Sequence, residues 1–344
     1  SFGWASEFVT PAHKAVIGTV LQYGFVTGSL LVTGLSYRVG SEQWRVVIAL
    51  VSALPLPIII GTLQMPESPR WLLRVGGDDT SWKQALLRVA QLNGRWVALT
   101  AVFNSDRLHA VKGHKGGNIS TGGSITSLVE DGPLRRMSAV VCLLWFTFAT
   151  TFFGLSLVSS SLPGGEHLNM LIAALCQCPA LAATLFSLQR FGRRPTILTL
   201  LILIGFSCSA LAALTASRLP KLRVVLALVG SASTSSAFSC GYIYTGDLFP
   251  TAVRSVGLSA GSQVARIGAF FSPVILLLRD QSPALPFTLW AALALAAAGS
   301  ALLLPETAGA ESLETVHDLH LLLQRNGCGV LLGSRLGGRI MREA

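Results

Sequence analysis

Long apolar windows separated by polar connectors recur along this chain of 344 residues. A helix needs about 20 predominantly apolar residues to cross the hydrocarbon core of a bilayer. In lipid the backbone N–H and C=O groups must bond to one another, so a window of this length is predicted to be a helix. Eight windows meet this condition: Ala15–Tyr37, Trp44–Met65, Met137–Leu157, Asn169–Leu188, Thr196–Ala216, Val224–Tyr244, Leu258–Leu278 and Leu285–Leu304. The sequence therefore predicts an all-α polytopic membrane protein with about eight transmembrane helices.

The composition agrees with this fold class. Hydrophobic residues make up 51% of the chain and charged residues only 12%, whereas soluble domains carry about 25% charged residues. A single window could be the core helix of a soluble protein, but eight windows at this density argue against that alternative. The net charge of +10 could also indicate nucleic-acid binding. No basic stripe with interleaved aromatic residues is found, so we expect membrane lipid and not nucleic acid as the partner of these charges.

The sequence indicates neither a cofactor nor an enzyme. Five of the six cysteines lie inside predicted spans, where they act as small apolar side chains, and no zinc-ligand spacing is found. We therefore expect no metal ion and no cofactor. The segment Gly257–Gly261 matches the G-x-S-x-G nucleophile elbow. That elbow needs a strand-to-helix turn, whereas this segment begins a predicted membrane span, so a hydrolase is not expected.

The windows are unevenly spaced. Two come first, a hydrophilic stretch from Pro66 to Arg136 follows, and six more come after it. Within the stretch, apolar positions at helical spacing predict a short amphipathic helix over Ser81–Leu92. Most of the 26 Lys and Arg residues lie on the side of this stretch. The positive-inside rule therefore places it, and the C-terminus, in the cytoplasm, although Arg218–Arg223 adds basic residues on the other side.

Four segments carry a family resemblance. The run Pro66–Leu73 closes the second window with two prolines and two charges, and Glu7–Lys14 precedes the first window. Gly192-Arg193-Arg194 and Asp247–Arg254 lie between later windows. Together they resemble motifs of the solute carrier 22 family, the organic anion and cation transporters of the major facilitator superfamily. Asp247 stands where that family usually has Glu, and Lys14 where it usually has Arg.

The resemblance implies an organisation for the chain. The eight windows correspond to helices five to twelve of a twelve-helix major facilitator fold, truncated at the N-terminus. Residues 1–65 would be the remnant of the N-terminal lobe and 66–136 the cytoplasmic central loop. Residues 137–305 would be the C-terminal six-helix lobe and 306–344 a cytoplasmic tail. The family also implies the plasma membrane as the location.

The resemblance further implies a cytoplasmic gate. Opposite charges at the cytoplasmic ends of neighbouring spans could form a latch that holds one state of the gate. The alternative is that these residues only snorkel and set the topology. The gate candidates are Glu67, Arg70, Arg193, Arg194, Asp247 and Arg254.

Arg266 is the sharpest candidate for solute binding. It is the charged residue near the centre of the window Leu258–Leu278, and a charge at that depth costs about 3 kcal/mol on insertion scales. No acidic residue lies in a predicted span to compensate it, so a solute anion or backbone carbonyls must do so. The segment Val264–Gly268 resembles helix eleven of the family's anion-transporting branch, and arginine binds carboxylates in bidentate fashion. Packing against carbonyls is the alternative.

Other residues inside the spans could line the same path. Leu181 stands where many anion-transporting relatives have Lys, and two phenylalanines stand where the family often has tyrosine, so the path is less polar than usual. The serines around Ser231–Ser239 fit either helix packing or a cavity lining. The remaining candidates for substrate binding are Gln22, Tyr23, Phe152, Phe153, Gln177 and Tyr242.

These observations predict a secondary transporter of small organic ions, with a preference for anions. In alternating access, two lobes rock around a site near the membrane midplane. The alternative is a membrane protein that does not transport, such as a receptor, a scaffold or a regulatory truncated transporter. Whether upstream sequence encodes four more spans would discriminate between them.

Overall fold

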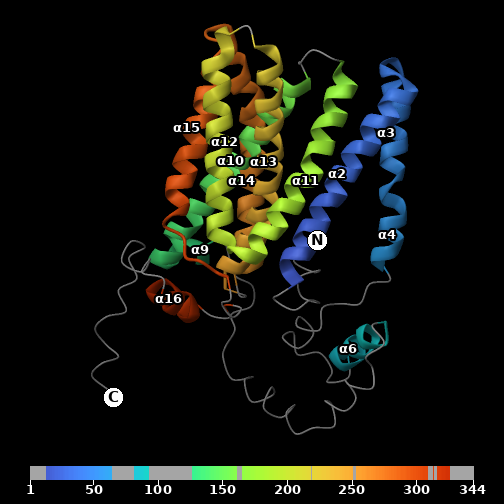
Figure 1. Cartoon of the computed structure of the whole chain (residues 1–344). Helices are drawn as coiled ribbons and strands as arrows, with labels where there is room; N and C mark the ends of the chain where they lie inside the picture. The colour runs from blue at the N-terminus through green and yellow to red at the C-terminus, as the bar shows by residue number, and fades with distance from the viewer. Residues whose placement is uncertain are drawn as a thin grey trace. The chain divides into compact units, whose positions relative to one another are not determined.

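The computed structural model describes residues 13–63, 81–92, 126–160, 165–217, 219–250, 253–308, 313 and 316–325 (Figure 1). Over these residues it shows α-helices and short 3-10 turns and no strand, so the predicted all-α class is confirmed. The chain divides into two compact units. One consists mainly of Ile48–Thr121, and the other mainly of Pro11–Val47 with Gly122–Ala344.

The larger unit holds the long helices. Most of them begin and end within a few residues of the predicted windows, because the windows are bounded by Gly, Pro and charged residues. The helices are α2 (Lys14–Val39), α9 (Ser127–Glu130), α10 (Gly132–Ser160), α11 (Glu166–Arg190), α12 (Arg193–Ala213), α13 (Pro220–Leu248), α14 (Arg254–Leu277), α15 (Leu285–Ala301) and α16 (Val316–Arg325), with 3-10 turns at Ser41–Gln43, Leu214–Ala216 and Leu278–Asp280.

Six of the described helices, α2 and α10 to α14, are long and apolar enough to cross a membrane. The other two predicted spans form shorter apolar helices. The window Trp44–Met65 is broken at Leu54 into α3 (Trp44–Ala53) and α4 (Pro55–Leu63), because Pro55 has no N–H to continue the helical ladder. The last window ends as α15 at Ala301 and leaves through a turn before Pro305.

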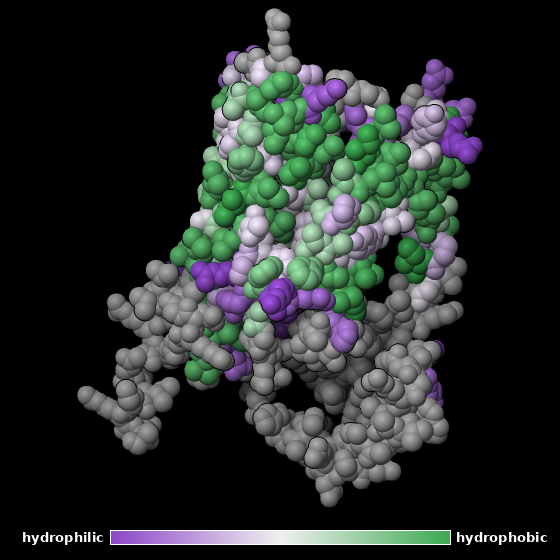
Figure 2. All heavy atoms as spheres, in the orientation of Figure 1, coloured by the Kyte–Doolittle hydropathy of each residue, from purple (hydrophilic) through white to green (hydrophobic). Residues whose placement is uncertain are grey.

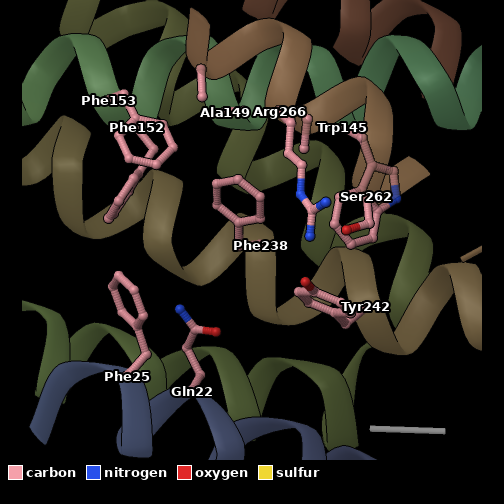
Figure 3. Close-up of a pocket in the computed structure, with 12 residues that line it drawn as sticks. Gln22, Phe25, Trp145, Ala149, Phe152, Phe153, Phe238, Tyr242, Ser262 and Arg266 are labelled. Carbon is pink, nitrogen blue, oxygen red and sulfur yellow. The ribbon is translucent and has the colours of Figure 1, made fainter. Parts of the chain in front are cut away.

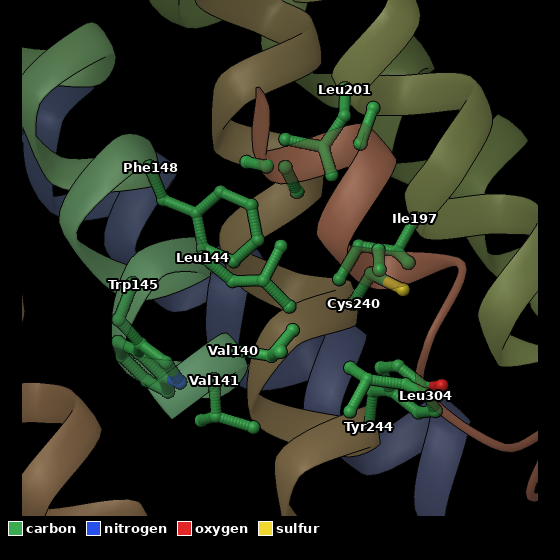
Figure 4. Packing of buried hydrophobic residues seen from close by; sticks show 14 of the residues in the cluster. Val140, Val141, Leu144, Trp145, Phe148, Ile197, Leu201, Cys240, Tyr244 and Leu304 are labelled. Carbon is green, nitrogen blue, oxygen red and sulfur yellow. The ribbon is translucent and has the colours of Figure 1, made fainter. Parts of the chain in front are cut away.

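Helix α10 lies at the centre of the larger unit. It packs against α13, α14 and α15, while α12 covers α13 and α15, and α11 lies between α13 and α2. The core consists of buried apolar side chains from these helices. Figure 4 shows Leu144 and Phe148 of α10 facing Ile197 and Leu201 of α12, with Cys240 of α13 nearby. These residues belong to the main hydrophobic core, and a second, smaller cluster of Val26, Ala174 and Leu181 joins α2 to α11.

Glycines bring α10 and its neighbours into close contact. A Cβ atom added at Gly268 of α14 would lie 2.6 Å from the backbone oxygen of Phe146. A Cβ added at Gly154 of α10 would lie 2.1 Å from the ring of Trp290 on α15. Small residues at membrane helix interfaces allow such close backbone approach. Gly257 and Gly261 are also used for packing, because a Cβ atom there would lie 2.6 Å from the ring of Phe249 and 2.7 Å from Nε1 of Trp145.

The outer surface of the larger unit suits a lipid environment. Large apolar side chains point outward from α11, α12 and α14, among them Phe186, Phe206 and Phe270. Figure 2 shows hydrophobic residues over the middle of the described helices and hydrophilic residues gathering near their ends. This distribution agrees with a belt of lipid around the helices.

The smaller unit is described over α4, most of α3 and α6 (Ser81–Leu92). Helix α6 spans the residues predicted for the short amphipathic helix, and its Ala85 and Ala90 are buried. The gate candidates Glu67 and Arg70 lie outside the described residues. The division into a central loop and two lobes stays a prediction.

The contact between α10 and α14 can be tested by adding a methyl group. We expect Gly268→Ala to lower the free energy of unfolding by about 1–3 kcal/mol, because the methyl group meets backbone and must push the helices apart. Gly299→Ala in α15 is the matched control, since open space surrounds that position and alanine favours helix by up to about 1 kcal/mol. Thermal unfolding of the two purified variants measures the difference. Equal melting temperatures would contradict the close contact.

Candidate functional site

A cavity of about 340 Å³ opens among α2, α10, α13 and α14 of the larger unit (Figure 3). Half of the residues around it are aromatic, and one is charged. The lining residues are Gln22 and Phe25 of α2; Trp145, Ala149, Phe152 and Phe153 of α10; Phe238 and Tyr242 of α13; and Ser262, Ala265, Arg266 and Ala269 of α14.

Helical spacing explains how α14 supplies four of these residues. Ser262, Ala265, Arg266 and Ala269 recur at intervals of three and four, so they form one stripe along the helix. Gly261 and Gly268 lie on a different stripe, which rests against α10. Packing through the glycine stripe therefore turns the stripe that holds Arg266 toward the cavity.

Arg266 is the charged group of the cavity. It lies twelve residues after the start of α14 and eleven before its end, close to the middle of the helix. Figure 3 shows its guanidinium group extending between Phe238 and Tyr242. Its Nη1 donates a hydrogen bond of 3.4 Å to Oε1 of Gln263, and the described residues place no carboxylate in an ion pair with it. A guanidinium has five N–H donors, so most of them remain available to a ligand.

Aromatic rings form the apolar walls. Phe152 meets Phe25 of α2 with ring centroids 6.0 Å apart and Phe238 of α13 at 5.8 Å, both edge to face. Trp145 meets Tyr242 at 4.6 Å in the same geometry. Edge-to-face pairs are the favoured arrangement of aromatic side chains. The cavity thus joins one cationic group to an aromatic surface, which can hold an anion that has an apolar body.

The structure places five of the seven predicted binding residues around this cavity: Gln22, Phe152, Phe153, Tyr242 and Arg266. The other two join helices instead. The hydroxyl of Tyr23 donates to the carbonyl oxygen of Cys178 at 2.8 Å, which ties α2 to α11. Oε1 of Gln177 accepts from Ser235 at 2.8 Å, which ties α11 to α13.

Sequence reasoning missed the lining residues Phe25, Trp145, Phe238 and Ser262. Phe25, Phe238 and Ser262 each lie three or four residues along a helix from a predicted binding residue. Trp145 lies seven residues from the predicted residue Phe152. That spacing is the signal that could have found them, because side chains at these intervals share one face. Two hydroxyls of α13 behave differently: Ser233 and Thr234 donate to carbonyl oxygens of their own helix.

A second polar site lies where α12 begins and α13 ends. Nε of Arg193 and Oδ2 of Asp247 are 3.3 Å apart, and the two side chains are 15% and 13% exposed. Arg254 donates to the carbonyl oxygens of Phe249 at 3.3 Å and of Leu313 at 3.4 Å. Arg194 donates to the carbonyl oxygen of Leu302. Of the six gate candidates, the structure thus joins Arg193 and Asp247 in an ion pair.

Glu306, which the gate prediction did not include, binds the start of α12. Its carboxylate accepts hydrogen bonds from the backbone N–H groups of Arg193 at 3.0 Å and Arg194 at 2.9 Å. It also accepts from the N–H groups of Thr307 at 2.9 Å and Ala308 at 2.8 Å. The first N–H groups of a helix have no partner within it and favour an anion. Gly192 makes room, because a Cβ atom there would lie 2.9 Å from the carboxylate, and its φ of 101° suits glycine.

The segment Gly257–Gly261 lies inside α14. A nucleophile elbow requires a strand-to-helix turn, so this sequence match is not an elbow.

The helices and their arrangement define the class of protein. Six of the helices in the described residues are long and apolar enough to cross a membrane, as in a multi-pass integral membrane protein. The structure is similar to that of the proton:xylose symporter XylE of the major facilitator superfamily, with a TM-score of 0.66 at 17% identity over 93% of this chain and 69% of that one. At this identity the likeness shows the fold, and the predicted major facilitator fold is confirmed.

The sequence comparison shows the family. The pattern of the sugar (and other) transporter family matches residues 4–319, and the chain belongs to that family. It is 30% identical over 316 residues to solute carrier family 22 member 13 of Homo sapiens, covering 92% of this chain and 55% of the relative. It is 28% identical over 320 residues to the organic cation transporter protein of Drosophila melanogaster, covering 91% and 57%. These relatives confirm the resemblance to the solute carrier 22 family. The chain spans about half the length of the curated relatives it matches.

The role of Glu306 can be tested with an isosteric change. We expect Glu306→Gln to lower the free energy of unfolding by about 1–3 kcal/mol, because the amide removes the charge and leaves a backbone N–H of α12 without an acceptor. Asp280→Asn is the matched control, since Asp280 is exposed in the 3-10 turn that follows α14. Thermal unfolding of both purified variants gives the comparison. A Glu306→Gln variant as stable as Asp280→Asn would show that the cap contributes nothing.

Proposed function

We propose that this protein is a secondary transporter of small organic anions that works by alternating access. The observation that supports this most is Arg266, a guanidinium near the middle of a membrane-length helix, lining a cavity and holding no carboxylate among the described residues. A charge at such depth is costly and typically marks a pathway for solutes or ions. Membership of the transporter family agrees with this proposal.

The cavity supports a small solute with an apolar body. Its volume of about 340 Å³ lies within the usual range of small-molecule sites, roughly 300–1,000 Å³. The guanidinium would bind the carboxylate or another anionic group, and the rings of Phe152, Phe238 and Tyr242 would contact the rest. A cationic solute would be repelled by Arg266, so we propose anions, although one relative's name refers to organic cations.

We propose that the ion pair Arg193–Asp247 is part of the latch of the cytoplasmic gate. We also propose that the C-terminus lies in the cytoplasm and that the protein resides in the plasma membrane. Both side chains of the pair are mostly buried, so the cost of removing the two charges from water offsets much of their attraction. The pair can therefore break and form again in each transport cycle if both groups are hydrated when it opens. Arg254 and Arg194, which donate to backbone carbonyls of segments that follow α13 and α15, would hold those segments at the same gate. Glu67 and Arg70 stay candidates for the side of the gate that would face this ion pair.

Arg266 provides the test of anion transport. In cells that express the full-length protein, we expect saturable uptake of labelled benzoate, an aromatic monocarboxylate, and no uptake of tetraethylammonium. Arg266→Ala and Arg266→Asp should lower benzoate uptake by about tenfold or more, since hydrogen bonds to charged groups are worth about 1.5–3 kcal/mol. Arg279→Ala, at the exposed end of the same helix, is the control for loss of a positive charge.

Uptake must be normalised to the amount of protein at the cell surface. Uptake of benzoate that survives in Arg266→Asp would contradict the role of Arg266. Absence of uptake of every probe by the unmodified protein at the surface would contradict transport, and would favour a receptor or scaffold.

The latch can be tested by exchanging its charges. We expect Arg193→Asp and Asp247→Arg each to lower the rate of uptake several-fold, because two like charges then face each other at 3.3 Å. The double variant with both changes restores the attraction and should recover part of the rate. Arg190→Asp, at the exposed last residue of α11, controls for the change in net charge. Equal loss in the single and double variants would argue against a latch.

A further inference from the structure

Trp145 of α10 lines the cavity and also contacts the end of α13 that carries the ion-pair residue Asp247. Its side chain is 1% exposed, and its ring forms part of the cavity lining. It meets Tyr242 edge to face at 4.6 Å and Phe238 at 6.1 Å, and both belong to α13 and line the cavity. The indole thus supports the aromatic wall beside Arg266, as Figure 3 shows.

The same indole also forms a hydrogen bond near the end of α13, where the ion-pair residue Asp247 lies. Its Nε1 donates to Oγ1 of Thr245 at 3.1 Å. Thr245 is buried and lies two residues before Asp247, the partner of Arg193. Thr245 also follows Tyr242 by three residues, so both lie on the face of α13 that meets α10. The ring and the N–H of Trp145 therefore contact two successive turns of α13.

Helix α14 contacts the indole as well. A Cβ atom at Gly261 would lie 2.7 Å from Nε1 of Trp145, so the backbone of α14 rests on the ring. The next residue, Ser262, lines the cavity, and Arg266 follows one turn later. One side chain of α10 thus touches two of the helices that line the cavity, α13 and α14, and α13 also carries Asp247 of the proposed gate.

The physical properties of tryptophan make this contact a rigid one. The indole has only two side-chain torsions, and its single N–H donor sets the angle of the ring plane. If the end of α13 moves when the ion pair breaks, Thr245 moves with it. The indole must then rotate or leave its N–H without a partner, and a buried donor without a partner costs about 1–3 kcal/mol. Rotation would shift the wall formed by Tyr242.

We propose that Trp145 is a positioning residue that couples the ion pair Arg193–Asp247 to the shape of the cavity, through its hydrogen bond to Thr245. The proposal rests on the proposed function, because it assigns the link between solute site and gate in alternating access. It does not require the solute to be known. Coupling of this kind is measured as the failure of two changes to act independently.

The experiment measures the accessibility of the cavity with a thiol reagent. Ser262→Cys introduces a thiol at the cavity, and the rate of its reaction with maleimide is measured. The rate for the same protein without Ser262→Cys is subtracted as the background. In the full-length purified protein, Asp247→Asn breaks the ion pair, and we expect it to change this rate by about threefold or more. With Trp145→Phe, which keeps an aromatic ring but removes the N–H, Asp247→Asn should change the rate by less than about 1.5-fold.

Two further variants keep the test decisive. Thr245→Val removes the acceptor and leaves the tryptophan, so it should abolish the effect of Asp247→Asn in the same way. Trp290→Phe is the matched control, because Trp290 is also buried, lies on α15, and has an indole N–H without an acceptor in the structure. It should leave the threefold effect intact.

Three results would overturn the proposal: an effect of Asp247→Asn that persists in Trp145→Phe, an effect that Trp290→Phe also abolishes, or no effect of Asp247→Asn with Trp145 present. Labelling needs no transported solute, so its outcome is separate from that of the uptake assay. If no solute is taken up but Trp145→Phe still removes the effect of Asp247→Asn on labelling, only the proposal of transport is rejected. If uptake depends on Arg266 but Trp145→Phe leaves the effect of Asp247→Asn unchanged, only the role of Trp145 is rejected.

Discussion

The close approach of α14 to α10 determines how the rest of the larger unit is arranged. Gly261 and Gly268 remove the side chains that would hold the two helices apart, and Thr150 of α10 can then donate to the carbonyl oxygen of Gly268 at 3.2 Å. Once this face of α14 is fixed, helix geometry fixes the direction of the adjacent stripe. Because α14 packs on α10 in this way, Arg266 faces the cavity and the indole of Trp145 meets the backbone of α14.

Polar groups inside the helices follow two patterns with different consequences. Many hydroxyls, such as those of Thr147 and Thr184, donate to the carbonyl oxygen four residues earlier in their own helix, which satisfies them without a neighbour. Others join helices, as Tyr23 does with Cys178. Arg266 fits neither pattern, since its hydrogen-bond partner among the described residues is Gln263, one turn away at 3.4 Å. A guanidinium with N–H donors left over in this setting is the feature that points to a ligand.

The sequence predicted the fold well and the site in part. Apolar length and bounding Gly and Pro residues depend on local physics, so helices such as α12 and α13 and the lone charge of Arg266 could be predicted from the chain. Whether Gln177 faces a cavity or a serine on another helix depends on the rotation of α11 about its own axis relative to α13. No local sequence pattern predicts that rotation. Glu306 was missed for the same reason: its partners, Arg193 and Arg194, are more than 100 residues away in the chain. The break at Leu54 follows from Pro55 and could have been predicted.

Two carboxylates at the charged end of the helices differ in what they can do during a transport cycle. Glu306 accepts four backbone N–H groups, and its side chain joins the start of α12 to the segment after α15. Separating Glu306 from α12 would leave the N–H groups of Arg193 and Arg194 without partners, so these segments should move as one body. Asp247 instead meets the side chain of Arg193 at 3.3 Å, and two side chains can separate without exposing the N–H groups at the start of a helix. If the ends of α12 and α13 separate at all, the separation should therefore occur between Arg193 and Asp247, with Glu306 still bound to α12.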